Sequence, residues 1–185
     1  MRVLFYCVFL SLAIGNAVFA TQNSIVEFFA IGKPSFLKIH GESAEASQNL
    51  KIQDDIKTKE KKISGTVILK LDTFSTKMSL RDKHLKEKTF ETQKYPEAIL
   101  TIDPIIAPAN QKTKSDFTGK LNFHGVEKPV KGTVELDTSN ASTLNYSAQF
   151  SILLSDYSIP APTFSGMTID QKIDVTSTGK VNSAP

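Results

Sequence analysis

The side chains that could carry chemistry are few in this chain. Three histidines, His40, His84 and His124, stand far apart, and none has a second histidine or a cysteine at the close spacing of a zinc site. The only cysteine, Cys7, lies in an apolar N-terminal stretch. No serine stands in a glycine-x-serine-x-glycine nucleophile elbow, and no phosphate loop or dinucleotide fingerprint occurs. The sequence therefore predicts no metal site, no cofactor and no enzymatic activity.

Arg81 is the only arginine beyond residue 20 in a chain that otherwise uses lysine. A guanidinium presents a rigid fork of donors that lysine cannot copy, which indicates a geometric requirement at this position. Two uses remain open. The commoner one is structural, an ion pair or a carbonyl clamp that holds its segment against the rest of the fold. The other is contact with the polar head group of a ligand.

Arg81 lies between two predicted strands. The residues from Ile63 to Leu71 alternate in polarity and predict the first strand, and Ala98–Ile102 predicts the second, ended by Asp103-Pro104. Between them, helix formers with apolar residues at helical spacing from Leu80 to Leu85 predict one short helical crossing. A connection of this length is typical of a binding loop or a lid.

This part of the chain resembles a known family. Two blocks of residues carry the resemblance: Asp72-Thr73, Met78, Arg81-Asp82-Lys83-His84-Leu85, Phe90 and Tyr95-Pro96 in the first, and Phe117 to Val130 in the second. Both blocks and their spacing resemble the YceI-like family of lipocalin-like proteins, whereas Asn23 to Leu50 matches only loosely. The resemblance implies an extended lipocalin-like β-barrel of about eight strands that encloses an isoprenoid or similar long-chain lipid in an apolar tunnel.

The resemblance also implies which residues form the binding site. The apolar candidates for the tunnel lining are Phe74, Met78, Leu85, Phe90, Phe117, Leu121, Phe123, Phe150 and Tyr157. The candidates for the polar end are Arg81, His84 and Tyr95. For each residue, ordinary core packing or a structural hydrogen bond is an equal alternative.

One late segment departs from the family pattern. The family usually carries a basic residue followed by Ser-Asp-Phe-Gly, and here the segment reads Leu154-Ser155-Asp156-Tyr157-Ser158. The aspartate and an aromatic residue are kept, but the basic residue and the glycine are not. If that basic residue holds a polar head group in relatives, this chain is expected to prefer a less acidic or differently shaped ligand.

Residues 1–20 have the features of a secretory signal peptide. Arg2 supplies the positive charge, Val3–Ile14 the apolar stretch, and Val18-Phe19-Ala20 a cleavage site before Thr21. We therefore expect export to the periplasm, no stable membrane insertion after cleavage, and one YceI-like barrel domain over residues 21–185.

The composition of residues 21–185 limits both how the fold can be stabilised and which classes of partner the chain could bind. The absence of cysteine there means that hydrophobic burial, not disulfides, must stabilise the fold. Without Arg2 the chain has 21 basic and 19 acidic side chains, a balance that argues against a nucleic-acid partner. A homodimer remains possible because relatives can pair, although no interface signal is visible.

Strand patterns predict an all-β, antiparallel fold. Alternation of apolar and polar residues is clearest in the second half of the chain, over 117–123, 130–136, 146–152 and 169–175. Shorter strands are expected at 24–29 and 36–40, with loops at 104–115 and 155–166 and at most one short strand within 42–62. Periodicity alone does not separate a barrel from a sandwich, and the family resemblance favours the barrel.

The interior of such a barrel has two possible states. A hollow barrel would serve as a lipid carrier, and a barrel filled by its own side chains would suit a stress-related structural or interaction protein without a ligand. The discriminating feature is whether Phe117, Phe123 and Phe150 meet across the barrel axis or leave a continuous cavity.

Overall fold

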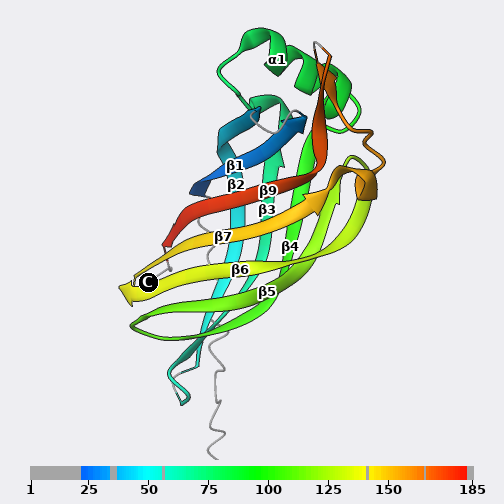
Figure 1. The fold of residues 1–185 in the computed structure, drawn as a ribbon. Helices are drawn as coiled ribbons and strands as arrows, with labels where there is room; N and C mark the ends of the chain where they lie inside the picture. The colour runs from blue at the N-terminus through cyan, green and yellow to red at the C-terminus, as the bar shows by residue number, and fades with distance from the viewer. Residues whose placement is uncertain (1–21, 34–36, 56, 141, 165, 183–185) are drawn as a thin grey trace, which may run out of the picture.

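Eight long antiparallel strands build a closed barrel. The computed structural model describes residues 22–33, 37–55, 57–140, 142–164 and 166–182, so the predicted signal peptide lies outside the described residues. The strands follow the order β1–β2–β3–β4–β5–β6–β7–β9, and β1 also pairs with β9, which closes the sheet (Figure 1). Closure pairs the two strands that would otherwise be edges. The predicted all-β barrel of about eight strands is confirmed.

The elements alternate between long strands and short connections. In chain order they are β1 (Gln22–Lys33), β2 (Lys38–Asp55), β3 (Glu60–Lys70), η1 (Leu71–Thr73), α1 (Ser79–His84), η2 (Leu85–Thr89), β4 (Glu97–Pro108), β5 (Lys112–Phe123), β6 (Val126–Asn140), β7 (Thr143–Leu153), η3 (Leu154–Tyr157), β8 (Thr163–Phe164) and β9 (Met167–Asn182). The two-residue strand β8 pairs only with the start of β9.

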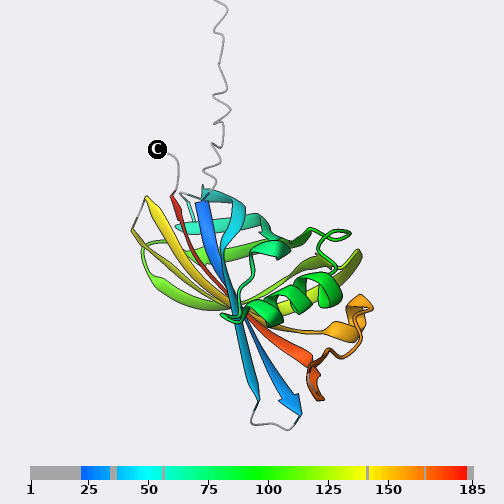
Figure 2. The same cartoon turned by 90° about the horizontal axis from the view of Figure 1, so that it is seen from above.

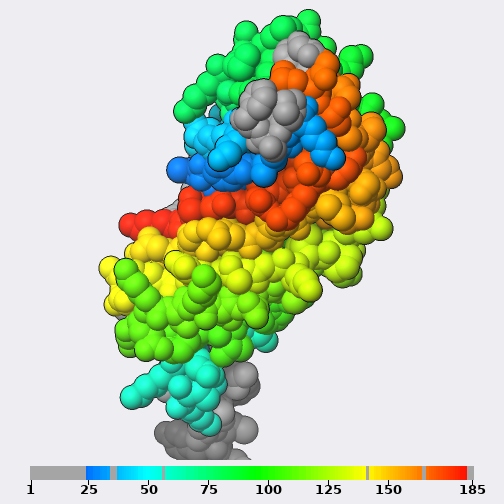
Figure 3. Space-filling view, viewed as in Figure 1, coloured from blue at the N-terminus to red at the C-terminus, as the bar shows by residue number. Residues whose placement is uncertain are grey.

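The predicted helical crossing lies between β3 and β4. It comprises a 3₁₀ turn (η1), the short α-helix α1 and a π-helical turn (η2) that continues α1 directly. Seen from above, α1 and η2 lie across one end of the barrel (Figure 2). In the space-filling view, this segment, the neighbouring ends of β1 and β2 and the β8–β9 hairpin gather at the same end (Figure 3).

The prediction for the N-terminal third was wrong in one respect. β2 runs without interruption from Lys38 to Asp55, where the sequence predicted a strand ending at Gly41 and at most one short strand afterwards. The buried positions of β2 carry small or polar residues instead of large apolar ones, so the hydrophobic alternation that marks a strand is missing. These buried residues are Gly41, Ser43, Ala46 and Gln48.

The predicted loop over 104–115 was also wrong, because β4 continues through Pro104 to Pro108 and β5 begins at Lys112. Pro104 is tolerated for two reasons. The register between β3 and β4 shifts next to it, and β5 pairs with β4 only as far as Ile102. Pro104 therefore lies at a bulge on one side and beyond the ladder on the other, where a missing backbone N–H breaks no strand pairing.

Candidate ligand-binding site

A cavity of about 280 Å³ lies inside the barrel at the end that the helical crossing covers. Inward-facing residues of every barrel strand except β6 line it, together with residues of the crossing and of the β8–β9 hairpin. Its volume is nearly twice that of the ~150 Å³ apolar cavity that holds a benzene ring. It approaches the lower end of the ~300–1,000 Å³ range typical of small-molecule pockets.

The cavity occupies only part of the barrel. Its deepest level is the ring of lining residues that lie furthest from the crossing on their strands: Val26, Val67, Leu100, Leu121, Phe150 and Ser177. Strand pairing places Val26 beside Ser177, and Leu100 between Val67 and Leu121. Beyond this ring, buried side chains fill the interior, among them Phe117, Val134, Leu136, Leu144 and Val181. We call the cavity-bearing end, down to this ring, the hollow half, and the remainder the packed half.

The three phenylalanines chosen to separate a hollow from a filled barrel give a mixed answer. Phe117 and Phe150 meet edge to face, with ring centroids 6.1 Å apart, beside Gly132 of β6 rather than across the axis, and they mark the boundary between the halves. Phe123 instead packs against Phe90, with centroids 5.6 Å apart, on the wall of the cavity. The barrel is thus filled by its own side chains at one end and hollow at the other.

A row of aromatic rings forms one side of the hollow half. Consecutive centroids lie 5.2 Å apart for Phe28 and Phe74, 5.9 Å for Phe74 and Phe90, and 5.4 Å for Phe123 and Tyr157. Tilted and edge contacts of this kind stabilise each pair by about 0.5–1.5 kcal/mol beyond burial. The row connects β1, the crossing, β5 and η3, so it couples the covering segment to the barrel wall.

Arg81 and Asp82 fix the crossing through the same residue, Thr76. The Arg81 guanidinium donates to Thr76 twice, from Nε to Oγ1 at 2.7 Å and from Nη2 to the carbonyl oxygen at 2.7 Å. The Asp82 carboxylate accepts from the Thr76 backbone N–H at 2.7 Å and from its hydroxyl, and from the Ser75 hydroxyl at 3.1 Å. These contacts match the structural use considered for Arg81, whose side chain also borders the cavity.

This network lowers the pKa of Asp82. Partial burial acts to raise the pKa of the carboxyl group, but the hydrogen bonds from Thr76 and Ser75 outweigh burial and hold the pKa below its ordinary value. Asp82 is therefore ionised at neutral pH and acts as the anionic anchor of the loop before α1. The sequence gave no sign of this anchoring role for Asp82.

Nine of the twelve predicted site residues line the cavity. They are Phe74, Met78, Arg81, His84, Leu85, Phe90, Leu121, Phe123 and Phe150. Strand alternation and helical spacing place them on inward faces, and closure of the barrel brings them together. Whether they contact a ligand remains a prediction.

The other three predicted residues lie elsewhere. Phe117 belongs to the packed half. Tyr157 is buried behind Phe123, and burial, reinforced by the neighbouring Asp156, raises its pKa to about 12. Tyr95 covers the β5–β6 turn, where its ring lies 4.2 Å from that of His124, measured between centroids.

His124 has structural partners on both sides of its ring. Its Nδ1 lies 3.1 Å from the Tyr157 carbonyl oxygen, and its Nε2 lies 2.9 Å from Glu91 Oε2. His124 thus has one backbone partner and one side-chain partner. With Tyr95, this histidine ties the β5–β6 turn to η3 and to the segment after η2.

Several lining residues were missed by the sequence analysis. Ile169, Ile173 and Val175 were recognised as inward-facing on β9, but only as core residues. Leu37 and Ile39 fell within the strand predicted over 36–40 but were given no binding role, and the hairpin residue Met167 was not singled out. Their role depends on which strand ends meet the crossing, which a local pattern does not contain.

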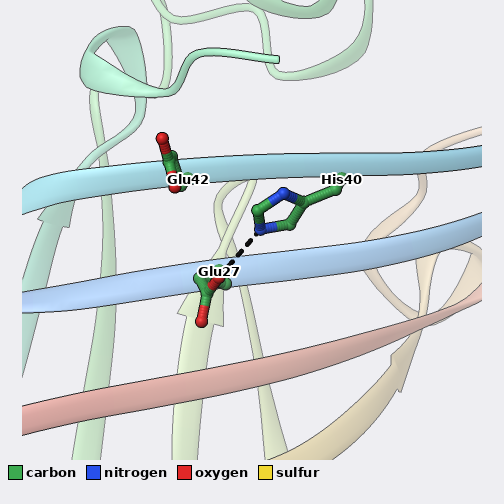
Figure 4. Close-up of side chains that lie close together, drawn as sticks. All are labelled: Glu27, His40 and Glu42. Carbon is green, nitrogen blue, oxygen red and sulfur yellow. Dashed lines mark hydrogen bonds and ion pairs between the residues drawn. The ribbon is translucent and has the colours of Figure 1, made fainter. Parts of the chain in front are cut away.

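A separate polar cluster lies on the outer face of β1 and β2 (Figure 4). His40 Nε2 is 2.9 Å from Glu27 Oε1, and Glu42 forms an ion pair with Lys77 at 3.1 Å. One ligand atom from each of Glu27, His40 and Glu42 lies within 4.8 Å of the others, a spacing that could hold a divalent cation. The ion pairs account for the same groups without a metal, so the cluster supports no functional conclusion.

Comparison with known proteins defines the family. The model of the YceI-like domain matches residues 18–181, which is nearly the whole chain. The protein belongs to the YceI-like family. A UPF0312 protein of Pseudomonas putida is 29% identical over 90% of this chain and 94% of its own length. Another, of Pseudomonas syringae pv. tomato, is 30% identical over 85% of this chain and 81% of its own length.

Solved structures share the fold of this YceI-like protein. A polyisoprenoid-binding domain of Saccharophagus degradans matches with a TM-score of 0.69 at 15% identity, covering 92% of this chain and 100% of that domain. BcnA of Burkholderia cenocepacia matches with a TM-score of 0.67 at 17% identity, covering 85% of this chain and 96% of BcnA. At these identities the likeness concerns the fold alone. Among the described residues, none forms a helix with the length and apolar content needed to cross a bilayer.

The late segment that departs from the family pattern lies beside the cavity. Leu154, which stands where the family usually has a basic residue, is only 4% exposed and lines the cavity wall. Ser158, which stands where glycine is usual, has a φ of 60°. Glycine adopts this left-handed conformation without the Cβ clash that serine suffers. In this chain the turn forms with serine in that conformation.

Proposed function

We propose that this YceI-like protein is a periplasmic carrier that encloses the apolar chain of an isoprenoid or similar amphiphile in the hollow half of its barrel. Residues 1–20 would direct export as a signal peptide, and the barrel would bind its ligand without transforming it. The observation that carries the proposal is the cavity itself, because an apolar space of about 280 Å³ is left open where the rest of the barrel is filled.

The physical chemistry of the cavity supports an apolar ligand. Transfer of a hydrocarbon chain from water into such a space is favourable by roughly 25 cal/mol per Å² of apolar area buried. Scaling from the ~150 Å³ that holds one benzene ring, the cavity accommodates on the order of a dozen carbon atoms. A longer prenyl chain would extend past the crossing or would require the crossing to move.

The polar residues of the cavity gather mostly at the crossing. Thr76, Arg81, His84 and Thr89 come from the crossing, and Thr163 comes from the β8–β9 hairpin. We place the head group of the ligand near these residues. Since Leu154 contributes no charge where relatives usually have a basic residue, we propose a weakly acidic or neutral head group. Replacement of Leu154 by arginine is then expected to shift the ligand profile toward acidic lipids.

The likeness to a polyisoprenoid-binding domain supports the same class of ligand by analogy of fold. A carrier role, in place of catalysis, is supported by the use of the ionisable groups around Arg81. Asp82 faces Ser75 and Thr76 in bonds that hold the loop before α1. The Asp82 carboxylate therefore has a structural use, and this use favours a carrier role over a catalytic one.

The decisive experiment is native mass spectrometry of the protein purified from the periplasm, followed by organic extraction of its ligand. We expect a chain that begins at Thr21 and a stoichiometric prenyl or long-chain species. If the protein is isolated empty, it should take up added prenyl alcohols or fatty amides. Retention of residues 1–20 would contradict cleavage of a signal peptide, absence of the protein from the periplasm would contradict the periplasmic assignment, and failure to take up any of these lipids would favour a barrel without a ligand.

A matched pair of variants locates the ligand. Ala98 lines the cavity, and Ala98→Phe places a ring inside it. Lys131 is exposed on β6, the one barrel strand that does not line the cavity, so Lys131→Asp serves as the control. We expect Ala98→Phe to weaken lipid uptake at least tenfold and Lys131→Asp to leave it unchanged. Equal uptake by both variants would place the ligand elsewhere.

A further inference from the structure

Four polar side-chain atoms of the described residues are buried and have no hydrogen-bond partner. One, Gln171 Oε1, belongs to the first half of β9, and the other three are Ser177 Oγ, Tyr146 OH and Gln48 Oε1. Such groups are rare in folded proteins, because a donor or acceptor that leaves water without gaining a partner destabilises the fold. Three of them at one level of a barrel therefore need a physical explanation.

Strand pairing places all three beside the same short piece of β9. Ser177 lies on β9 itself, paired with Val26 of β1. Tyr146 is paired with Gly179, and its hydroxyl lies 2.7 Å from the point that a Cβ of Gly179 would occupy. Gln48 reaches β9 from β2, with its Nε2 donating to the carbonyl oxygen of Lys180 at 2.7 Å. These three unpaired atoms thus gather around residues 177–180.

This level is the floor of the cavity. Ser177 is the last residue of β9 that lines the cavity, it is only 6% exposed, and it is the one polar member of the deepest ring. The other polar lining residues stand at the opposite end, near the crossing. The cavity therefore has polar groups at its two ends and an apolar wall between them.

We infer that the floor around Ser177 is a second polar subsite, which binds a hydroxyl or carbonyl oxygen at the inner end of the enclosed chain. The inference rests on the proposed lipid-binding function and adds a specificity to it. The Ser177 hydroxyl both donates and accepts, and Ser177 is the member of this group that lines the cavity, whereas Tyr146 and Gln48 lie beside Gly179 and Lys180, outside the lining. A chain with oxygen at both ends would satisfy the floor and the crossing together.

The test compares two probes of equal chain length, 1-dodecanol and 1,12-dodecanediol, by calorimetric titration of the full exported chain after lipid extraction. Over an apolar floor, the second hydroxyl would lose its hydration without a partner, and the diol would bind at least tenfold more weakly than the monoalcohol. Over a polar floor, we expect the two dissociation constants to agree within about threefold.

Variants assign the effect to the floor. Ser177→Ala should weaken the diol relative to the monoalcohol by roughly tenfold. Ser147→Ala is the matched control, because Ser147 stands between Tyr146 and Ala148 on β7 and alternation turns it to the outer face. That control should leave the ratio of the two dissociation constants unchanged.

Thermal unfolding of the ligand-free protein gives a second readout. An unpaired buried hydroxyl destabilises the empty barrel, so Ser177→Ala is expected to raise Tm, whereas loss of a structural hydrogen bond would lower it. A diol-to-monoalcohol ratio that Ser177→Ala does not change would overturn the subsite, and would indicate that ordered water alone satisfies these atoms. If neither probe binds, the carrier function itself fails, and the subsite fails with it.

Discussion

The hollow and packed halves share one closed sheet, and they differ in how their inward side chains use the space around the axis. At the boundary with the packed half, Phe117 meets Phe150 edge to face beside Gly132 of β6, which is paired with both residues, and further buried side chains fill the interior beyond them. In the hollow half, large rings lie along the wall. Phe28 does so because β2 has glycine at position 41, where a Cβ would come within 2.2 Å of the Phe28 ring.

The difference shows that an aromatic-rich strand pattern is compatible with either a filled or a hollow barrel. Alternation decides only that a ring points inward. Whether space remains beside the ring depends on the size of the residues that the closed sheet places around it. The comparison of the two halves can be tested by substitutions made in matched pairs.

Truncation of a leucine should have the largest effect, and it should differ between the halves. Leu136 is buried in the packed half and Leu121 lines the cavity. We expect Leu136→Ala to lower the free energy of unfolding by about 3–5 kcal/mol. Leu121→Ala should lower it by only about 2 kcal/mol, because the cavity already deprives that side chain of contacts on one side. Denaturant unfolding measures both values, and equal losses would contradict the division into two halves.

Enlargement of an alanine is the opposite kind of substitution, and it should again destabilise the packed half more than the hollow half. Ala107 is fully buried in the packed half, and Ala98 faces the cavity. We expect Ala107→Phe to lower the free energy of unfolding by about 1–3 kcal/mol or more through overpacking. Ala98→Phe should be nearly neutral, since the new ring enters existing space, while it blocks ligand uptake. A strongly destabilised Ala98→Phe variant would mean that the space is not available to a ring.

Loss of the carboxylate that anchors the crossing should have an intermediate effect. We expect Asp82→Asn to lower the free energy of unfolding by about 1–2 kcal/mol at pH 7, because the bonds from Thr76 and Ser75 lose their ionised acceptor.

The same group predicts a pH dependence of stability. The pKa of Asp82 is lower in the folded chain than in the unfolded chain. Its contribution is therefore fully present above the unfolded pKa of about 3.9 and is lost as the pH falls through the folded pKa. Unfolding curves recorded from pH 7 down to pH 2 should show a smaller acid-induced loss for Asp82→Asn than for the wild type. Parallel losses would show that other carboxylates dominate.

The smallest expected effect is a gain in stability next to the cavity wall. Ser158→Gly should raise the free energy of unfolding by up to about 1 kcal/mol, because the native φ of 60° suits glycine. Tm from calorimetry checks the sign. The exposed Ser155, in the same turn but without a positive φ, provides the control, and Ser155→Gly should not stabilise.

Much of the architecture could be predicted from local patterns. The alternating residues of β5, β6, β7 and β9 were visible because one face of each strand is apolar. β2 was not, because its buried positions carry residues such as Ser43 and Gln48, whose burial makes sense only beside their partners. The continuation of β4 through Pro104 likewise depends on where β5 leaves it.

The candidate site was predicted in part for the same reason. Phe74, Phe90 and Phe123 could be assigned to the interior from the family pattern and their spacing, and the structure places them on the cavity wall. Tyr95, chosen for its polar end, lies instead against His124 at the β5–β6 turn. A short-range pattern reports that a side chain has a polar or apolar end, but not which of two nearby surfaces it faces.

The sequence by itself determined the family, the all-β class, the single helical crossing and the inward direction of most large apolar residues, because these follow from local periodicity and from motif residues. Only the tertiary structure decided where the barrel is empty and which polar groups border that space. Cavity volume is a difference between the space that strand pairing encloses and the side chains that enter it. Ser177 becomes the floor of a cavity only when β1 and β7 close on either side of it.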